Sequence, residues 1–377
     1  MEEWIKCPLG DILNFRRGHD LPKTSMIPGD IPVAGSNGII GFHNIATPIS
    51  PCITIGRSGN VGTPYIYGKC WAHNTVLYID DYKGNDPKYL YYLLKTLPLA
   101  SFGGGSAVPT LNRNHIHPLE VVFCKDIELQ KKIAGILSKI DDKIELNRQI
   151  NDNLEQQAQA LYKSWFVDFE PFKDGNFVES ELGQIPEGWE VRDIYKYTDV
   201  IYGAPYKSSL FNENKEGYPL IRIRDLKSFA PQFYTQEILP QTEYIIAGDV
   251  VAGMDAEFSP YIWQGEKGVL NQRCCKFKGQ YPWVSNYYLL NLLKPELEYV
   301  QSYKTGTTVS HLGKADIDRF KVITPPESIV KAFSVIVNSL LEQKVKCANE
   351  IRNLTNTRDI LLPKLMSGEL KINETDC

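Results

Sequence analysis

The stretch GSAVPTLNRNHI occupies residues 105–116, and GTTVSHLGKADI occupies residues 306–317. Both stretches carry glycine, a hydroxyl residue, valine, leucine and isoleucine at identical steps. A match of this length within one chain is either a coincidence or the mark of an internal repeat. The two explanations differ in what they predict for the flanking sequence, because only a repeat carries further landmarks at a similar offset.

Landmarks on both sides of these stretches do recur. Trp4 returns as Trp189, and Gly18 returns as Gly203 at the same offset. The motif YYLL, which begins at Tyr91, begins again at Tyr287, and this offset differs only slightly from that of the two quoted stretches. The offset drifts only by insertions of the size of a loop. We therefore interpret the chain as a tandem duplication.

Two segments with sustained heptads give the clearest structural signal. The seam positions of the first segment are Ile133, Leu137, Ile140, Ile144, Asn147, Asn151, Leu154, Ala158, Leu161 and Trp165. Those of the second are Phe333, Val337, Leu340, Lys344, Cys347, Ile351, Leu354, Arg358, Leu361 and Leu365. A narrow two-row seam is typical of a helix that meets one partner helix. The sequence therefore predicts two long helices that pair with each other.

Polar residues interrupt both seams. Asn147 and Asn151 lie in the first seam, and Lys344 and Arg358 lie in the second. Such residues are costly inside a uniform coiled coil, where they can fix register and orientation. The alternative is that they face water along a frayed stretch, and the sequence leaves both interpretations open.

The region before each heptad segment has the composition of short strands. CITIGRSGNVGTPYIYGKCWAHNTVLYI, at residues 52–79, indicates successive strands joined by glycine turns, and residues 249–277 are its counterpart. A short helix follows in the first copy, with Asp86 as its cap and Pro87 as its first residue. The fold class is therefore α+β, with two tandem β-rich domains and two long helices.

These signals divide the chain into six segments. They are a first β-rich domain at 1–125, a central helix at 126–166, a linker at 167–188, a second β-rich domain at 189–325, a C-terminal helix at 326–362 and a tail at 363–377. The linker is punctuated by proline and glycine, and we expect it to dock against the folded parts.

Composition favours a folded protein of the cytoplasm. The chain is 43% hydrophobic and 11% aromatic, which suffices for buried cores. No apolar run approaches the roughly 20 residues of a membrane helix, and the amino end MEEWIKCPLGD lacks a signal segment. The eight cysteines nowhere show the two-residue spacing of zinc or redox motifs. We expect reduced thiols, no bound metal and no membrane association.

The net charge of −4 is unevenly distributed. Residues 126–188 carry 7 basic and 13 acidic groups, whereas residues 1–125 carry 11 and 9, and residues 189–325 carry 16 and 16. The β-rich domains can therefore present local basic faces, but they lack the broad positive field of an autonomous DNA-binding protein. Partners would have to add affinity.

Motifs of catalysis do not hold up. GTPYIYGKC has five residues between its glycines where a phosphate loop has four, and Cys70 replaces the hydroxyl that binds magnesium. GRSGNVG lacks the following helix of a dinucleotide fingerprint. His115 and His117 alternate on an expected strand, where one histidine facing solvent is the ordinary explanation. We assign no catalytic residue, and we interpret the two domains as recognition modules.

Polar and basic residues on expected loops are the candidates for contacts with phosphates or base edges. They are Arg57, Ser58, Asn60 and Lys69 in the first domain, and Arg222, Arg224, Lys227 and Lys276 in the second. For each of them, a solvated surface side chain is the ordinary alternative.

Several stretches resemble one family closely, the specificity subunit of type I restriction-modification systems. The most specific are LYKSWFVDFEPF from Leu161, ELGQIPEGWEV from Glu181, LNQRCCKF from Leu270 and LLPKLMSGEL from Leu361. The resemblance implies that 1–125 and 189–325 are target-recognition domains, each reading half of a split, asymmetric sequence in double-stranded DNA. It also implies that the long helices pair antiparallel as a spacer.

The same resemblance implies that chemistry resides in partner subunits. Two modification subunits would methylate adenine with S-adenosylmethionine, and restriction subunits would use ATP and magnesium. Gly105 and Gly306 would form turns, while Val108, Leu111, Val309 and Leu312 would fill cores. The two copies differ most at 19–60 and 204–255, where we expect much of the sequence readout.

Two other classes stay open on the sequence alone. One is a recognition scaffold that binds no nucleic acid, which the near-neutral charge permits. The other is the recognition half of a single-chain restriction-methylation enzyme. The absence of motifs for a methyl donor or a nuclease disfavours the second.

Overall fold

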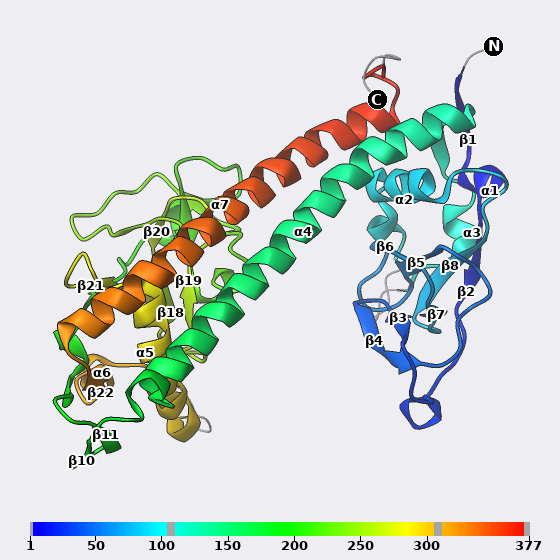
Figure 1. The fold of residues 1–377 in the computed structure, drawn as a ribbon. Coiled ribbons are helices and arrows are strands. Elements are labelled where there is room, and N and C mark those ends of the chain that lie inside the picture. The colour runs from blue at the N-terminus through cyan, green and yellow to red at the C-terminus, as the bar shows by residue number, and fades with distance from the viewer. Residues whose placement is uncertain (1–2, 104–109, 305–310, 373–377) are drawn as a thin grey trace. The chain divides into compact units, whose positions relative to one another are not determined.

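A computed structural model describes residues 3–103, 110–304 and 311–372, and it contains two compact units. Unit 1 comprises Met1–Ile144 and Asn353–Cys377, and unit 2 comprises Glu145–Arg352. Two helices have 40 residues each, α4 (Ile127–Phe166) and α7 (Glu327–Met366). One part of each helix belongs to unit 1 and the other part belongs to unit 2. Figure 1 shows the course of the chain. The fold is of mixed helix and strand, as the sequence predicts.

Unit 1 is built on a four-stranded antiparallel sheet in the order β2-β8-β5-β6. Its strands are β2 (Asn14–Arg17), β5 (Cys52–Gly56), β6 (Pro64–Tyr67) and β8 (Val76–Asp81). Every residue of β5 is buried, because the strand lies inside the sheet and its apolar side chains enter the core. The expected strands joined by glycine turns are thus confirmed for residues 52–79.

Smaller elements complete unit 1. Strand β1 (Trp4–Pro8) pairs with β9 (Glu120–Cys124), and β3 (Ile31–Gly35) lies between β4 (Gly38–His43) and β7 (Trp71–Ala72). The short helices are α1 (Leu9–Ile12), α2 (Pro87–Thr96) and α3 (Arg113–Ile116). The carboxylate of Asp86 accepts a hydrogen bond from the backbone N–H of Tyr89 at 2.8 Å, which confirms the cap expected before Pro87.

Unit 2 repeats the same plan. A four-stranded sheet in the order β13-β21-β18-β19 corresponds to β2-β8-β5-β6, and β12 pairs with β22 as β1 pairs with β9. These strands are β12 (Glu190–Asp193), β13 (Thr198–Tyr202), β18 (Val250–Gly253), β19 (Pro260–Ile262), β21 (Cys274–Gly279) and β22 (Lys321–Thr324). Helices α5 (Asn286–Lys304) and α6 (Lys314–Ile317) follow. The tandem duplication is therefore present in the strand order.

The copies differ most in the sheet that each adds to this plan. Unit 1 adds three strands, whereas unit 2 adds five in the order β14-β16-β15-β20-β17. These are β14 (Phe211–Asn212), β15 (Tyr218–Ile221), β16 (Tyr234–Thr235), β17 (Tyr244–Ile245) and β20 (Gly268–Leu270). The added sheets draw on residues 31–72 and 211–270. The two units thus share the four-stranded sheet and differ in the sheet that is added to it.

The linker at 167–188 packs onto unit 2 through aromatic rings. It contains β10 (Phe177–Ser180) and β11 (Gly183–Pro186), which form a hairpin. Phe169 and Phe172 contact Trp189 with ring centroids 5.5 and 5.0 Å apart. Phe166 at the end of α4 lies 4.9 Å from Phe333 on α7. The expected docking of this segment is therefore what the structure has.

The two long helices pair antiparallel. In unit 1, Ile133 and Leu137 of α4 share a core with Leu362 and Leu365 of α7. In unit 2, Phe166 near the end of α4 shares a core with residues near the start of α7, Phe333 and Val337 among them. The beginning of each helix therefore packs against the end of the other, which is the antiparallel pairing that the family resemblance implies.

Two local expectations differ from the structure. Helix α7 continues to Met366, beyond the end expected at 362, because Leu365 and Met366 are buried in the core of unit 1. His115 and His117 do not lie on a strand: His115 is in α3 and His117 follows it. The Nε2 atom of His117 accepts a hydrogen bond from the backbone N–H of Phe15 at 3.1 Å, so the role of this histidine is structural.

The repeated stretches contribute Leu111 and Leu312, which are both fully buried. The other positions expected to form turns or fill cores, Gly105, Val108, Gly306 and Val309, lie outside the described residues. Gly18 and Gly203 occupy matching places, where the backbone of a neighbouring segment comes very close. A Cβ atom would lie 2.0 Å from the carbonyl oxygen of His73 at Gly18, and 2.1 Å from that of Asn271 at Gly203.

We expect Gly18→Ala and Gly203→Ala each to lower the free energy of unfolding by about 1–3 kcal/mol, because the facing backbone must move. Gly135→Ala is the matched control: nothing lies within 4 Å of its Cβ on helix α4. This control should raise stability by about 0.5–1 kcal/mol through helix propensity. Thermal unfolding of the three variants measures the effects, and equal midpoints would contradict the close approach.

Candidate nucleic-acid interface

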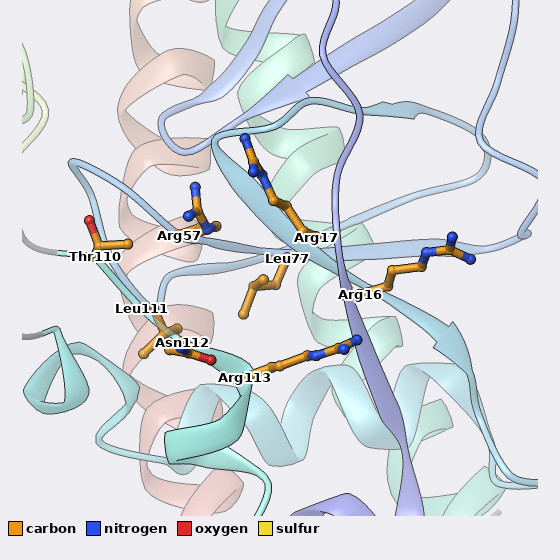
Figure 2. A pocket seen from close by; sticks show the side chains of 8 residues that line it. All are labelled: Arg16, Arg17, Arg57, Leu77, Thr110, Leu111, Asn112 and Arg113. Atoms are coloured by element: carbon orange, nitrogen blue, oxygen red, sulfur yellow. The ribbon is translucent and has the colours of Figure 1, made fainter.

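Unit 1 carries an arginine-lined groove with a volume of about 410 Å³. It lies where the end of β2, the loop after β5 and the start of α3 meet (Figure 2). The residues that line it are Arg16, Arg17, Arg57, Leu77, Thr110, Leu111, Asn112 and Arg113. We call this feature the arginine groove. Its floor is apolar and its rim is basic.

Backbone carbonyls hold two of the guanidinium groups in place. Arg113 donates from Nη1 to the carbonyl oxygen of Phe15 at 3.0 Å, and Arg57 donates from Nη1 to that of Asn74 at 3.4 Å. Arg57 is half-buried, whereas Arg16 and Arg113 are exposed. Figure 2 shows the side chains of Arg17, at the end of β2, and Arg57, just after β5, pointing in the same direction.

The groove is positively charged with little internal compensation. Arg17 lies 3.9 Å from Asp20, and both of these side chains are more than half exposed. In the described part of the chain, Arg16, Arg57 and Arg113 have no carboxylate within ion-pair distance. Burial lowers the pKa of Arg57 from its ordinary value, and the charge of Arg17 lowers it further. Guanidinium groups stay charged at neutral pH, so the groove attracts anions.

The candidates from the sequence are scattered in unit 1. Arg57 lines the arginine groove, and Ser58 beside it forms a bridge with Thr110. Asn60 is exposed, and its Oδ1 accepts a hydrogen bond from Thr63 at 3.1 Å. Lys69 is exposed and does not line the groove. The structure therefore brings Arg57 and Ser58 to one place and leaves Asn60 and Lys69 elsewhere on the surface.

In unit 2, internal partners occupy most of the candidates. Lys276 is 9% exposed and forms ion pairs with Glu243 and Asp249, both at 2.9 Å. Burial alone would lower the pKa of Lys276, but hydrogen bonds to these two carboxylates raise it above its ordinary value. Lys276 is therefore committed to the fold, because removing it would leave two half-buried carboxylates without their cation.

The three remaining candidates of unit 2 lie near one short turn, Ile223–Asp225. Arg222 stacks on Phe233 at 4.3 Å and pairs with Asp225 at 3.5 Å. Lys227 is exposed and pairs with Glu257 at 2.9 Å. Arg224 is exposed and has no ion-pair partner among the residues that the structure describes. Of the three, Arg224 is the one whose guanidinium is available to a ligand.

Sequence reasoning missed Arg16, Arg17 and Arg113. A signal was present, because Arg16 and Arg17 directly precede the repeated glycine Gly18, and Arg113 lies inside the first quoted stretch. The meeting of these residues with Arg57 depends on tertiary structure. Strand β2 pairs with β8, which is remote from it in the sequence, and the backbone N–H of Leu111 donates to the carbonyl oxygen of Arg57 at 2.7 Å.

The seam residues of α4 and α7 are buried or half-buried, including the polar ones. Ile133, Leu137, Ile144, Asn147, Asn151, Leu154, Phe333, Val337 and Lys344 are buried, and Ile140, Leu161, Leu340, Ile351, Leu354, Leu361 and Arg358 are half-buried. None of these described side chains is exposed, so the polar positions do not simply face water. Asn151 instead donates from Nδ2 to Oε1 of Gln264 in unit 2 at 3.1 Å.

Two ion pairs cross between the helices. Lys344 pairs with Glu155 in unit 2, and Arg358 pairs with Asp141 in unit 1 at 2.8 Å. Asp141 lies two heptads before Glu155, and Arg358 lies two heptads after Lys344. Equal steps in opposite directions along the two helices are the relation expected for antiparallel helices in a constant register.

Neither metal ligands nor a membrane helix is apparent in the described residues. No group of three or more histidine, cysteine, aspartate or glutamate side chains is placed to hold a metal ion within 3–103, 110–304 and 311–372. Over the same residues, none of the helices combines the length and the apolar character needed to cross a membrane.

Comparisons with known proteins converge on one family. The family described as "Type I restriction modification DNA specificity domain" matches residues 1–156 and 186–353. The MjaIX specificity subunit of Methanocaldococcus jannaschii, a type I restriction enzyme, is 30% identical over 76% of this chain and 70% of its own length. The HindI specificity subunit of Haemophilus influenzae is 27% identical over 65% of this chain and 68% of its own length.

A solved structure has a similar fold. The S subunit of a type I restriction-modification system from M. genitalium superposes with a TM-score of 0.59 at 16% sequence identity. The match covers 98% of this chain and 97% of that one. At this identity the likeness concerns the architecture, which includes two β-rich domains and long helices.

The ion pair in the seam of unit 2 gives a stability prediction. Glu155→Gln removes the partner of Lys344, which is 2% exposed, and should lower the free energy of unfolding by about 1–3 kcal/mol. The double variant Glu155→Met with Lys344→Met should be much closer to wild type, because no buried charge is left unpaired. Glu327→Gln, which breaks an exposed pair with Lys331, should change stability by less than about 0.5 kcal/mol. Chemical denaturation tests all three, and an unchanged Glu155→Gln would contradict the pairing.

Proposed function

Because the chain belongs to the family of type I restriction modification DNA specificity domains, we propose that it reads the DNA target of a type I restriction-modification complex. In this role each unit contacts one half of a bipartite, asymmetric sequence in double-stranded DNA. The chain itself supplies recognition. Methyl transfer and cleavage belong to partner subunits.

The observation that carries this proposal is that the two units share one backbone framework and present different side chains on it. In unit 1 the backbone N–H of Leu111 donates to the carbonyl oxygen of Arg57, and in unit 2 that of Leu312 donates to Met254, both at 2.7 Å. Bridges at the next residues, Ser58 with Thr110 and Asp255 with His311, match as well. Local twofold symmetry of duplex DNA suits a protein with two related modules. Different side chains on the shared framework then suit two different half-sites.

The helical seam supports a role for α4 and α7 as the spacer between the half-sites. Each helix is continuous over 40 residues, and each contributes to both units. Within unit 2 the pair of Glu155 with Lys344, and within unit 1 the pair of Asp141 with Arg358, fit one and the same register. In the proposed role, the number of residues in the two helices sets the number of base pairs between the half-sites, because the rise per residue and the rise per base pair are both constant.

Partners follow from the family and from the charge. Type I specificity subunits work with modification and restriction subunits, and we assign this chain two modification subunits that methylate adenine. S-adenosylmethionine would bind in those subunits, and ATP with magnesium in the restriction subunits. The net charge of −4 supports such a division, because phosphates repel an acidic chain and partners must add affinity.

The experiment that tests this proposal is methylome sequencing of a host that expresses the chain together with its modification subunit. We expect adenine methylation at one bipartite, asymmetric sequence, and none when either subunit is omitted. Methyl transfer by the purified chain alone, with an active contaminant excluded, would contradict the proposal. Methylation that persists unchanged without the chain would contradict it as well.

Arg224 gives a prediction at the level of one residue. Its exposed guanidinium in unit 2 is available to a base edge, and a bidentate contact with guanine is worth about 1–3 kcal/mol. Arg224→Ala should relax one position in one half-site, by roughly tenfold in discrimination, and should leave the other half-site unchanged. Lys227→Ala, which removes a cation already paired with Glu257, is the matched control with a smaller effect. Methylome sequencing of both variants measures this, and an unaltered target with Arg224→Ala would exclude the contact.

A further inference from the structure

The two units differ in charge at the same place in the framework. Strands β2 and β13 both lead into the matching glycines Gly18 and Gly203, so the two residues before each glycine correspond. The backbone hydrogen bonds of Leu111 and Leu312 make their acceptor residues correspond. The four arginines of the groove, Arg16, Arg17, Arg57 and Arg113, thus have the counterparts Ile201, Tyr202, Met254 and Lys314.

Unit 2 also neutralises the charges that it has at this place. Asp255 stands where unit 1 has Ser58, and it forms an ion pair with Arg273 at 3.0 Å and lies 2.7 Å from Nδ1 of His311. Lys314 pairs with Asp318 at 3.0 Å. At these equivalent positions, positive charge is therefore concentrated in unit 1, whereas acidic partners compensate it in unit 2.

Hydrogen-bond donors dominate the arginine groove, because four of its eight lining residues are arginines. Its guanidinium groups carry donors only. The side-chain oxygen of Asn112 already accepts from the backbone N–H of Asn114 at 3.0 Å. Arg57 and Arg113 are held by backbone carbonyls, which fixes their orientation and leaves their other N–H groups for a ligand. The ligand that fits is an anion with several acceptor oxygens, and a phosphate has this chemistry.

We propose that the arginine groove of unit 1 binds a phosphate of the DNA backbone, and that unit 1 therefore supplies more of the salt-dependent affinity than unit 2. The proposal rests on the proposed function, since it takes DNA as the ligand. Three separate segments supply the arginines that line the groove. In Figure 2 the side chains of Arg17 and Arg57 point in the same direction, so these two guanidinium groups are the pair best placed for one anion. A contact with phosphate positions the protein on the duplex and carries no sequence information of its own.

The experiment measures binding of the full chain to two fluorescein-labelled duplexes, one with the methylome target and one with a scrambled sequence, over a range of salt concentrations. Arg57→Met introduces the residue that unit 2 carries, and Arg16→Met removes an exposed guanidinium. Each should reduce the slope of log affinity against log salt by about 1. The loss of affinity at low salt should be the same on both duplexes.

Three controls keep the outcome interpretable. Lys132→Met removes an exposed cation of unit 1 on helix α4 and should leave the slope unchanged. Arg57→Lys keeps the charge and should keep most of the slope. Thermal unfolding identifies a variant that fails to fold. If Arg57→Met fails to fold, Arg16→Met still provides the test, because no hydrogen bond within the described residues depends on the Arg16 side chain.

Unchanged slopes with folded Arg16→Met and Arg57→Met would overturn the inference, and so would a loss confined to the target duplex, which would mean base reading. Either result leaves the proposed function standing as long as bipartite methylation depends on the chain. A wild-type chain that binds neither duplex at low salt, together with methylation that does not depend on it, would overturn both.

Discussion

The pairing of α4 with α7 organises the cores of both units. Each helix buries part of its seam in the core of unit 1 and part in the core of unit 2. Isolated helices gain little stability from propensity alone, so the seam has to be covered along its length. Glu155 with Lys344 and Asp141 with Arg358 select one antiparallel register among those that the apolar positions would permit. Both β-rich domains are therefore tied to the same two helices.

Duplication accounts for the framework, and divergence accounts for the surfaces. Backbone contacts are the same in both copies, as at Leu111 and Leu312, because hydrogen bonds between main chains do not depend on the side chains that project from them. Unit 2 thus carries Met254 where unit 1 has Arg57, and Asp255 where unit 1 has Ser58, and both units keep the same backbone contacts at these positions. Under the proposed function, this separation would let one domain change the bases that it reads while the other domain and the helices stay as they are.

Periodic and local signals made most of the fold predictable from the sequence. The heptads located both long helices, and Asp86 with Pro87 located the start of α2, because these features act between residues close in the chain. The candidate site was less predictable. The sequence suggested that Lys276 and Arg222 were free charges on loops. In the structure, Lys276 forms ion pairs with two carboxylates that are distant in the sequence, and Arg222 pairs with a buried aspartate. Arg16, Arg17 and Arg113 were missed because strand pairing brings them to Arg57 from remote parts of the sequence.

Inserting one heptad into both helices tests most directly whether they fix the distance between half-sites. The insertions belong between Asn147 and Arg148 in α4 and between Ile351 and Arg352 in α7, which lie one heptad from Glu155 and Lys344 and so keep the seam in register. Seven residues lengthen each helix by about 10.5 Å. At about 3.4 Å per base pair, methylome sequencing should show a gap longer by about three base pairs between two unchanged half-sites. Efficient methylation with an unchanged gap would mean that the two helices do not set the distance between the half-sites.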